Sequence, residues 1–514
     1  MNSHTGAALL VALASAATVL AGLRWLRIAQ REHYLPGASL RFARRWWTAG
    51  RLNQALGALG VMGAVASAWW SPAALAAVVA AGTGPFGLTL RGRTSKLAWT
   101  GRLRRLALAA SVLAAAVIGL SGLAGLHPAL SAAALCALGA PVIVDVALAL
   151  AQPLEARLLR PYISRASQRL RSVGPKVVAI TGSFGKTTTK GYIAHLLGES
   201  LSSVATPASF NNTAGLARAI NEHLASGTQV FIAEMGTYGP GEIAAMCNWV
   251  SPDIAVITGL GPVHLERMGS VERIAEAKAE ILARARVAVI NVDHELLAEL
   301  AGKAEDEGKV VWSCSERAGG GDVTAIYEGA KLRVRATHFG CDLDVLAACE
   351  PGVVPGNVAC AVAVALSLGI PASKVATKLE SLPGAPHRRS KLKTANGTTV
   401  IDDTYNSNPA GARAALQMLA REGKTRVVVT PGMIELGPLQ ARENANFAAE
   451  AGAVASQLVI VGRTNARALL DGAKAARLPA RRARRRQDAV AWVSSQLGPG
   501  DAVLYENDLP DHYP

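Results

Sequence analysis

A glycine-bounded turn between an apolar run and a helical segment carries the residues best suited to chemistry. Residues 177–180 are apolar and mostly β-branched, which favours a buried strand, and residues 181–190 read Thr-Gly-Ser-Phe-Gly-Lys-Thr-Thr-Thr-Lys. Inward-pointing N–H groups and the start of the following helix make such a turn a phosphate cradle. Lys186 can reach the outer phosphates of a nucleotide, and the Thr187 hydroxyl can ligate Mg²⁺. The full phosphate-loop pattern has a glycine where this chain has Ile180, so the alternative is a chance match in a glycine-rich chain. Because a strand precedes the turn and a helix follows it, we interpret the turn as a nucleotide site.

Glu234 offers a carboxylate where the metal of a nucleotide would need one. It directly follows the apolar run 230–233, and the carboxyl ends of parallel strands meet at one edge of a sheet. Magnesium prefers hard oxygen ligands, so this carboxylate would order the ion beside the phosphates. A surface acid at the end of a strand is the alternative for Glu234 taken alone. Its location relative to the turn favours the metal site.

Strand-like runs alternate with helical segments in the part of the chain that holds these residues. The runs cover 177–180, 230–233, 254–258 and 287–291. This alternation predicts an α/β fold with a doubly wound parallel sheet, whose ligands lie at the carboxyl ends of the strands. Residues 310–350 alternate short strands with turns and predict a small β-rich insertion. We expect this ATP-binding domain to cover residues 170–383.

A second, smaller α/β domain of Rossmann-like type is expected over residues 384–514. A chain of 514 residues is too long for one core, and a Pro- and Gly-rich boundary lies at 382–386. Later strand-like runs, separated by helical segments, cover 398–401, 426–430 and 457–461. The six cysteines contain no CxxC pair and no metal spacing, which indicates reduced thiols or core residues.

Residues 1–152 predict a membrane domain of five helices. Half of the chain is hydrophobic, its mean hydropathy is +0.25, and the excess lies before about residue 152. Apolar runs long enough for a spanning helix cover 6–26, 52–70, 72–90, 106–124 and 129–151. A cleaved signal peptide is the alternative for the first run, but no lysine or arginine precedes it and arginine follows it. Asp145 in the last run is either a functional acid or a structural residue near the helix end or beside an arginine.

The net charge of +16 follows the flanks of these apolar runs. Arginine and lysine fill the loops at 24–51 and 91–105, whereas the N-terminal tip and the turns at 71–72 and 121–128 contain neither. By the positive-inside rule, the N-terminus is outside and everything after residue 152 is cytoplasmic, where ATP is. We therefore expect a multi-pass protein of the plasma membrane, with membrane lipid as a partner. A basic chain can also suggest nucleic acid, but this distribution of charge predicts no nucleic-acid partner.

Several short motifs resemble, in their order, those of the Mur ligases, the ATP-dependent amide-forming enzymes of peptidoglycan synthesis. The resemblance covers roughly residues 175–505 and is closest to the branch that adds D-alanyl-D-alanine to a UDP-muramoyl tripeptide. The motifs are Thr-Gly-Ser-Phe-Gly-Lys-Thr-Thr-Thr (181–189), Phe-Asn-Asn (210–212), Glu-Met-Gly (234–236), His-Leu-Glu (264–266), Ala-Lys-Ala-Glu-Ile (277–281), Asp-Asp-Thr-Tyr-Asn-Ser-Asn-Pro (402–409) and Pro-Gly-Met-Ile-Glu-Leu-Gly (431–437).

The resemblance implies a role for each motif. It implies catalytic roles for Lys186, Lys278 and His264, and substrate contacts for Asn211 and Asn212. Its implied Mg²⁺ ligands are Thr187, Glu234, His264 and Lys278, the last as a carbamylated lysine. Its implied ATP-binding residues are Gly182, Ser183, Gly185, Lys186, Thr187, Thr188, Asn357, Arg388, Asp403 and Asn406.

The implied reaction is amide formation driven by ATP. A carboxylate is a poor electrophile, so ATP converts it to an acyl phosphate, and the incoming amine then displaces phosphate. Lys186 and bound Mg²⁺ would neutralise charge on the transferred group. The expected partners are a cell-wall precursor carboxylate and an amino-acid or dipeptide amine. Closure of the two α/β domains over the nucleotide is expected to assemble the site.

The chain departs from the family at several positions. Gly259 replaces an asparagine, and Gly356 and Cys360 replace a histidine and an asparagine of the adenine-contacting motif. Residues 1–152 occupy the place of the UDP-binding domain, and 505–514 differ from the basic, serine-rich ending of the D-alanyl-D-alanine branch. The identity of the carboxylate substrate therefore stays open: it is a UDP-muramoyl peptide, or a lipid-linked or other envelope acid. An ATP-driven membrane transporter or regulator is the alternative from another class. ATP turnover distinguishes the two, because a ligase requires both an amine and a carboxylate, whereas a pump or sensor requires neither.

Overall fold

The computed structural model describes residues 3–92, 94, 96–338, 340, 342–350, 352–384, 390–405 and 407–514. They form two compact units. The first consists of Met1–Leu158, Gly462–Thr464 and Leu509–Pro514. The second consists of Leu159–Val461 and Asn465–Asp508.

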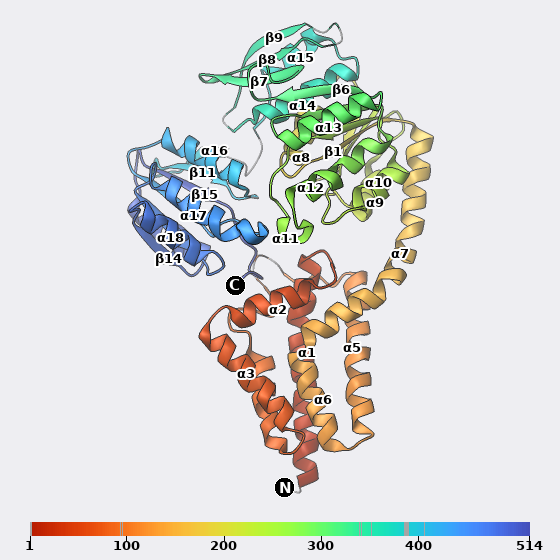
Figure 1. Cartoon of the computed structure of the whole chain (residues 1–514), viewed down its shortest axis with the longest axis vertical. Helices are drawn as coiled ribbons and strands as arrows, with labels where there is room; N and C mark the ends of the chain where they lie inside the picture. Colours follow the sequence, from red (N-terminus) through yellow and green to blue (C-terminus); the bar gives the residue numbers. More distant parts are fainter. Residues whose placement is uncertain are drawn as a thin grey trace. The chain divides into compact units, whose positions relative to one another are not determined.

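The first unit is built from helices (Figure 1). They are α1 (Ser3–Arg31), α2 (Ala38–Thr48), α3 (Arg51–Ala66), the 3₁₀ turn η1 (Ser71–Ala73), α4 (Ala74–Thr83), α5 (Gly101–Gly122), α6 (Leu126–Leu138) and α7 (Ala140–Val173). The last of them, α7, continues past residue 158 into the second unit.

Small side chains allow these helices to pack closely. Gly60 on α3 lies so near to α4 that a Cβ there would come within 2.7 Å of the Ala80 Cβ. Close approach through Gly and Ala is typical of helices in membranes. Several large apolar side chains point outward, and Leu120 and Leu123 are 69% and 86% exposed. An outward apolar surface of this kind fits a lipid environment.

The helices differ in length from the five predicted spans. Among the described residues, two helices are long and apolar enough to cross a membrane, Thr5–Arg31 and Gly101–Gly122. The count rises to three if the pair α6 and α7, bent by 79°, is one span. The difference arises because α3 has 16 residues and α4 has 10, whereas a span needs roughly 20. The apolar runs at 52–70 and 72–90 extend past these helices into turns.

Asp145 has a structural role in the first unit. Its carboxylate accepts hydrogen bonds from the backbone N–H groups of Ser39, over 3.2 Å, and Leu40, over 2.9 Å. These groups lie in the first turn of α2, where N–H groups have no partner within the helix. The carboxylate therefore caps α2, which is a structural role.

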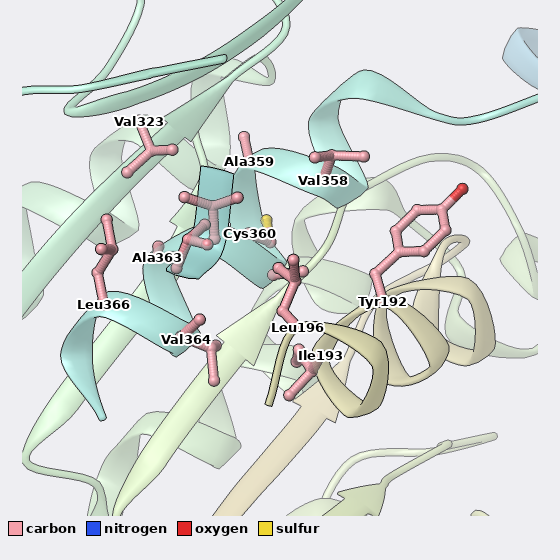
Figure 2. Close-up of a cluster of buried hydrophobic side chains, with 14 of the residues drawn as sticks. Tyr192, Ile193, Leu196, Val323, Val358, Ala359, Cys360, Ala363, Val364 and Leu366 are labelled. Atoms are coloured by element: carbon pink, nitrogen blue, oxygen red, sulfur yellow. The ribbon is translucent and has the colours of Figure 1, made fainter. Parts of the chain in front are cut away.

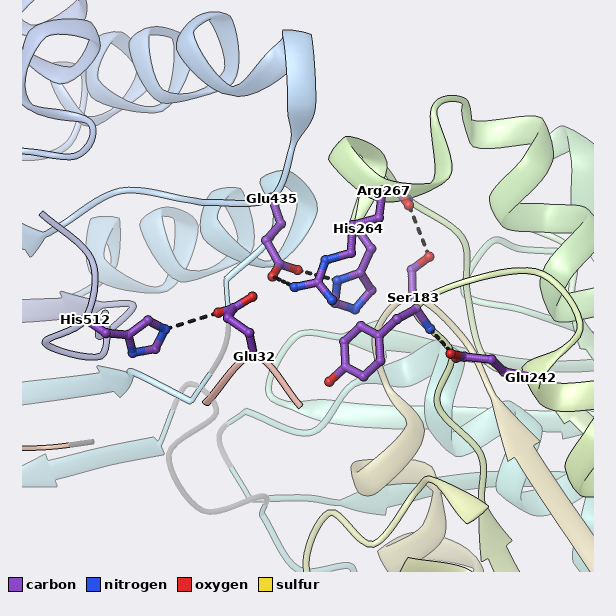
Figure 3. A network of polar contacts seen from close by, with 9 residues as sticks. Glu32, Ser183, Glu242, His264, Arg267, Glu435 and His512 are labelled. Atoms are coloured by element: carbon purple, nitrogen blue, oxygen red, sulfur yellow. Dashed lines mark hydrogen bonds and ion pairs between the residues drawn. The ribbon is translucent and has the colours of Figure 1, made fainter. Parts of the chain in front are cut away.

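Residues 509–514 pack with the first unit although they follow the second along the chain. The Trp46 Nε1–H donates to the His512 carbonyl over 2.8 Å, and buried Arg27 pairs with Asp511 over 3.3 Å. The His512 Nε2 lies 3.1 Å from Glu32 Oε1 (Figure 3). Contacts with α1 and α2 therefore hold this segment.

The second unit contains two sheets, of which the larger has nine strands. They are β1 (Lys176–Thr181), β2 (Ser203–Ala205), β3 (Val230–Glu234), β4 (Ile254–Ile257), β5 (Val287–Asn291), β6 (Val310–Ser315), β7 (Val323–Glu328), β8 (Lys331–Ala336) and β9 (Leu343–Ala348). Their order is β2-β3-β1-β4-β5-β6-β7-β8-β9. Neighbours from β2 to β7 are parallel, and β7, β8 and β9 are antiparallel. The predicted parallel sheet is confirmed. The segment expected as a β-rich insertion is part of it: residues 310–315 form a strand of the parallel sheet, and β7, β8 and β9 extend the same sheet.

Helices cover both faces of this sheet. They are α8 (Lys186–Leu197), α9 (Thr213–His223), α10 (Glu242–Val250), α11 (Leu265–Met268), α12 (Val271–Ala279), η2 (Glu280–Arg284), α13 (Glu295–Asp306), α14 (Pro355–Ser367) and α15 (Ala372–Leu379). In β1, Val178 and Ile180 join one apolar core, while Val177 and Ala179 join the other. Successive strand residues face opposite sides, so a strand covered on both faces is apolar throughout. Figure 2 shows the first core, in which α8 packs against α14.

The second sheet has six strands in the order β10-β11-β15-β12-β13-β14. Its elements are β10 (Ser390–Lys393), β11 (Thr399–Asp403), α16 (Pro409–Ala420), β12 (Arg426–Thr430), η3 (Gly437–Leu439), α17 (Gln440–Ala451), β13 (Gln457–Val461), α18 (Ala466–Ala475), β14 (Ala480–Ala483), α19 (Arg486–Gln496) and β15 (Ala502–Glu506). All neighbouring pairs are parallel except β10 with β11. Helices and parallel strands alternate here too, as the sequence predicts.

Candidate active site

The predicted phosphate-binding turn lies between β1 and α8, where only glycine fits at two positions. Gly185 has a φ of +85°, and a Cβ there would lie 2.4 Å from Asn357 Oδ1. A Cβ on Gly182 would lie 2.1 Å from the Thr258 hydroxyl oxygen. The Lys186 Nζ donates to the Gly182 carbonyl over 2.7 Å, so the lysine lies across its own turn. The backbone therefore has the tight curvature of a phosphate cradle, and Asn357 on α14 lies against it.

Ser183, Thr188 and the neighbouring loop complete the turn. The Ser183 hydroxyl donates to the Gly261 carbonyl over 3.1 Å, and its N–H donates to the Gly259 carbonyl over 2.8 Å. Thr188 is buried in the first turn of α8. A Cβ on Gly259 would lie 2.5 Å from the Phe184 ring. The Phe184 ring thus occupies space that a larger residue at 259 would need.

Glu234 lies at the end of β3 beside the start of α8, as predicted. The Thr187 hydroxyl donates to Glu234 Oε2 over 2.9 Å, and Asn211 Nδ2 donates to Oε1 over 3.3 Å. In the part of the chain that the structure describes, no three His, Cys, Asp or Glu side chains converge into a metal site of their own. Mg²⁺ at a nucleotide needs few protein ligands, because phosphate and water supply the rest. The Thr187 and Glu234 oxygens fit that role.

The two asparagines with predicted substrate contacts have different places. Asn211 reaches Glu234, and its carbonyl accepts from the Gly236 N–H over 2.7 Å. The Asn212 side chain accepts from the Gly215 N–H over 2.9 Å and caps α9. Asn211 therefore belongs to the site, whereas Asn212 orients the helix that follows. Substrate contact stays a prediction for both.

His264 contacts the loop after β12 in the second sheet. Its Nδ1–H donates to Glu435 Oε2, and Arg267 Nη2 donates to Glu435 Oε1 over 3.2 Å (Figure 3). A histidine whose Nδ1–H is held by a carboxylate presents the lone pair of Nε2, which is the usual arrangement in metal-ligating histidines. His264 and Glu435 both have left-handed backbones, with φ of 63° and 62°. Such conformations are often found at functional sites. The metal-ligand role of His264 stays a prediction.

Lys278 on α12 is almost fully buried, with 4% of its surface exposed. Burial, followed by the charge of Lys186, holds the pKa of Lys278 well below its usual range. A neutral amine is the form that reacts with CO₂ to give a carbamate, whose oxygens can bind Mg²⁺. The environment of Lys278 therefore fits the predicted modification.

The second sheet contributes Asp403 and a buried carboxylate at the ends of neighbouring strands. Asp403 ends β11 and is buried, while Arg388 and Asn406 lie outside the described residues. Glu506 ends β15, and its carboxylate accepts from the Ser407 and Thr430 hydroxyls. Burial raises the pKa of Glu506 to about 7. Glu506 thus links the end of β15 to the end of β12 and to the loop after β11.

Both α/β regions match Mur ligase domains. The Mur ligase middle domain matches residues 180–350, and the Mur ligase glutamate ligase domain matches residues 387–505. Together they make up more than half of the chain. The chain belongs to the Mur ligases.

Individual relatives place this Mur ligase near one branch. It is 31% identical over 305 residues to UDP-N-acetylmuramoyl-tripeptide--D-alanyl-D-alanine ligase of Bacillus subtilis, covering 57% of this chain and 62% of that protein. The crystal structure of MurF from Acinetobacter baumannii is similar with a TM-score of 0.59 and 27% identity, over 68% of this chain and 77% of that one. MurF of Thermotoga maritima in complex with ADP shares the fold, with a TM-score of 0.58 and 24% identity over 68% and 80%. The chain spans about three-fifths of the Bacillus relative's length.

Two departures of this Mur ligase from the family pattern have a local explanation. A Cβ on Gly356 would lie 2.7 Å from Asn291 Nδ2, so a histidine there would displace Asn291. Cys360 is fully buried in the core between α8 and α14 (Figure 2). A small apolar side chain fits that core better than an amide, which would need hydrogen-bond partners.

Sequence reasoning missed the site contacts of Lys190 and Glu435, and the buried carboxylate of Glu506 in the second sheet. Lys190 lies four residues after Lys186 and hence on the same side of α8, which is a signal that the sequence does contain. Glu435 belongs to the motif at 431–437, but its partner His264 is far away in sequence. For Glu506 the sequence shows only an acid at the end of an apolar run.

Proposed function

We propose that this chain is a membrane-bound, Mg²⁺- and ATP-dependent ligase that joins a cell-wall precursor carboxylate to the amine of an amino acid or dipeptide. The observation that carries the proposal is the contact of Thr187 with Glu234 at a turn where Gly182 and Gly185 admit no side chain. Family membership and the reaction named for the relatives support it.

The chain's own residues suit activation of a carboxylate by ATP. ATP supplies a phosphoryl group, which passes to the carboxylate oxygen as ADP leaves; the amine then attacks the carbonyl carbon and phosphate departs. Lys186 would neutralise the charge that develops on the transferred group. Thr187 and Glu234 would hold Mg²⁺, which, when bound, shields the phosphate oxygens. Lys278, as a carbamate, would add further oxygen ligands.

The apolar helices before residue 158 support attachment to the plasma membrane. Within the described residues, two or three of them are long and apolar enough to cross it, and exposed apolar side chains lie on their outer surface. The arginines at 24–51 and 91–105 and the positive-inside rule favour an external N-terminus and cytoplasmic catalytic domains. A lipid-linked muramoyl peptide would already lie at this surface, so it is the alternative to the UDP-linked peptide.

The test uses the full chain in lipid nanodiscs with ATP, UDP-muramoyl tripeptide and D-alanyl-D-alanine. We expect ADP release only when both substrates are present, together with a product of the summed mass less water. A parallel sample replaces the UDP-linked peptide with a lipid-linked muramoyl tripeptide in the same nanodiscs. ADP release at the same rate without carboxylate or amine would instead indicate an ATP-driven transporter or regulator.

A further inference from the structure

Lys190 is a buried cation that the proposed reaction does not use. It lies on α8, one turn after Lys186, and its side chain is only 7% exposed. Its Nζ donates to Glu234 Oε2 over 3.0 Å and to the Ala208 carbonyl over 2.6 Å. Burial of a charged amine is unfavourable unless the amine is paired and hydrogen-bonded, and these two contacts meet that condition.

The same carboxylate oxygen serves Lys190 and Thr187. Glu234 Oε2 accepts from the Thr187 hydroxyl over 2.9 Å, while Oε1 accepts from Asn211 over 3.3 Å. Each oxygen of the carboxylate therefore has a defined neighbour, which fixes the rotation of the side chain. Of the three side chains that donate to this carboxylate, Thr187, Lys190 and Asn211, the lysine carries a positive charge. Charge-assisted hydrogen bonds are roughly twice as strong as neutral ones.

Lys190 also ties the carboxylate to the loop before α9. Ala208 has a left-handed backbone with φ of 42°, and its carbonyl points at the lysine. In the same loop, the Thr206 hydroxyl accepts from the Glu234 N–H over 3.2 Å, and Asn211 contacts the Glu234 side chain. One lysine thus connects the phosphate-binding helix, the end of β3 and the loop at 206–212.

We propose that Lys190 is a positioning residue: it holds the Glu234 carboxylate in the orientation that binds Mg²⁺ and couples that orientation to the loop carrying Asn211. The proposal rests on the assignment of Glu234 as a ligand of nucleotide-bound Mg²⁺. Partners that orient a metal ligand typically raise metal affinity 10–100-fold. A lysine that merely competed with the ion would have the opposite effect, because its removal would strengthen metal binding.

The test measures Mn²⁺ as a probe for Mg²⁺, by electron paramagnetic resonance on the full chain in nanodiscs with ADP. Lys190→Met keeps the length and the apolar stem of the side chain but removes its charge. The matched control is Lys303→Met, because Lys303 lies exposed on α13. We expect Lys190→Met to weaken Mn²⁺ binding by about 10–100-fold, with ADP binding in the absence of metal unchanged. Lys303→Met should leave both unchanged.

A double-mutant cycle shows whether Lys190 acts through Glu234. In a Glu234→Gln background, Lys190→Met should cause no further loss of Mn²⁺ affinity. An equal loss in both backgrounds, unchanged affinity in Lys190→Met, or tighter binding would each overturn the proposal. If Lys190→Met does not fold, Lys190→Gln, which retains a donor for the Ala208 carbonyl, replaces it in the same cycle. Absence of Mn²⁺ binding in the parent protein would instead count against the proposed function, so the two failures are distinguishable.

Discussion

The His264 Nδ1–H donates to the Glu435 carboxylate, joining the loop after β4 to the loop after β12 (Figure 3). Arg267 contacts the same carboxylate, and the Glu435 carbonyl lies 3.4 Å from the Glu266 N–H. The two loops belong to the two sheets of the second unit, each at the carboxyl ends of its strands. Glu435 is therefore placed to bring the smaller sheet's loops to the nucleotide site.

Replacing Glu435 with Gln should lower kcat/KM about 5- to 100-fold. The amide keeps the shape of the side chain but loses the charge that pairs with His264 and Arg267, and such contacts contribute roughly 1–3 kcal/mol. Steady-state ADP release measures the effect. Glu450→Gln on α17 is the control, because its pair with Arg413 is exposed. Equal rates in the Glu435→Gln variant and the parent would mean that the contact has no part in turnover.

Replacing Lys278 with Ala should abolish most activity, and added acetate or propionate should restore part of it. The small carboxylate would occupy the place of the carbamate and supply its oxygens. A buried amine with a lowered pKa fits carbamylation. Activity is measured with and without the added acid, with Lys303→Ala as a control that should respond to neither change. Full activity of Lys278→Ala without added acid would contradict the carbamate role.

Replacing Glu506 with Gln should change the pH dependence of stability. Burial raises the folded-state pKa of Glu506 to about 7, above its ordinary value of 4.5. Folding thus favours the protonated carboxyl group. Its contribution to the free energy of unfolding is fully present below pH 4.5 and is lost as the pH rises to about 7. Between pH 5 and 8 the parent should lose up to about 3 kcal/mol that the variant does not lose. Melting temperatures across this pH range measure it; parallel curves would refute the assignment.

Replacing Asp511 with Asn should lower the melting temperature of the full chain in detergent. It leaves the fully buried Arg27 without its carboxylate. Breaking a fully buried pair costs about 3–5 kcal/mol, and because Asp511 is 24% exposed the expected loss lies at the lower end of that range. Asp508→Asn is the matched control, since its pair with Arg486 is partly exposed and should contribute at most about 1 kcal/mol. If the two variants melt alike, the segment 509–514 adds little stability to the first unit.

The sequence predicts those parts of the site that local patterns determine. The turn at 182–187 and Glu234 could be placed together because parallel strands end at one edge of a sheet. The contacts of Lys190, Glu435 and Glu506 depend on tertiary packing between distant segments, which one sequence does not show. The sequence overestimates the helix lengths at 52–70 and 72–90, because apolar turn residues such as Trp69 and Trp70 continue the apolar runs past the helix ends.

Transfer of ¹⁸O from the carboxylate substrate to inorganic phosphate tests the central claim most directly. The parent enzyme receives UDP-muramoyl tripeptide labelled in the reacting carboxylate, together with ATP, Mg²⁺ and D-alanyl-D-alanine, and the released phosphate is analysed by mass spectrometry. The account predicts labelled phosphate in step with product, and a roughly 10²–10³-fold slower release in Lys186→Ala, which lacks the charge that stabilises the transferred group. Unlabelled phosphate released at the same rate without the amine would contradict it.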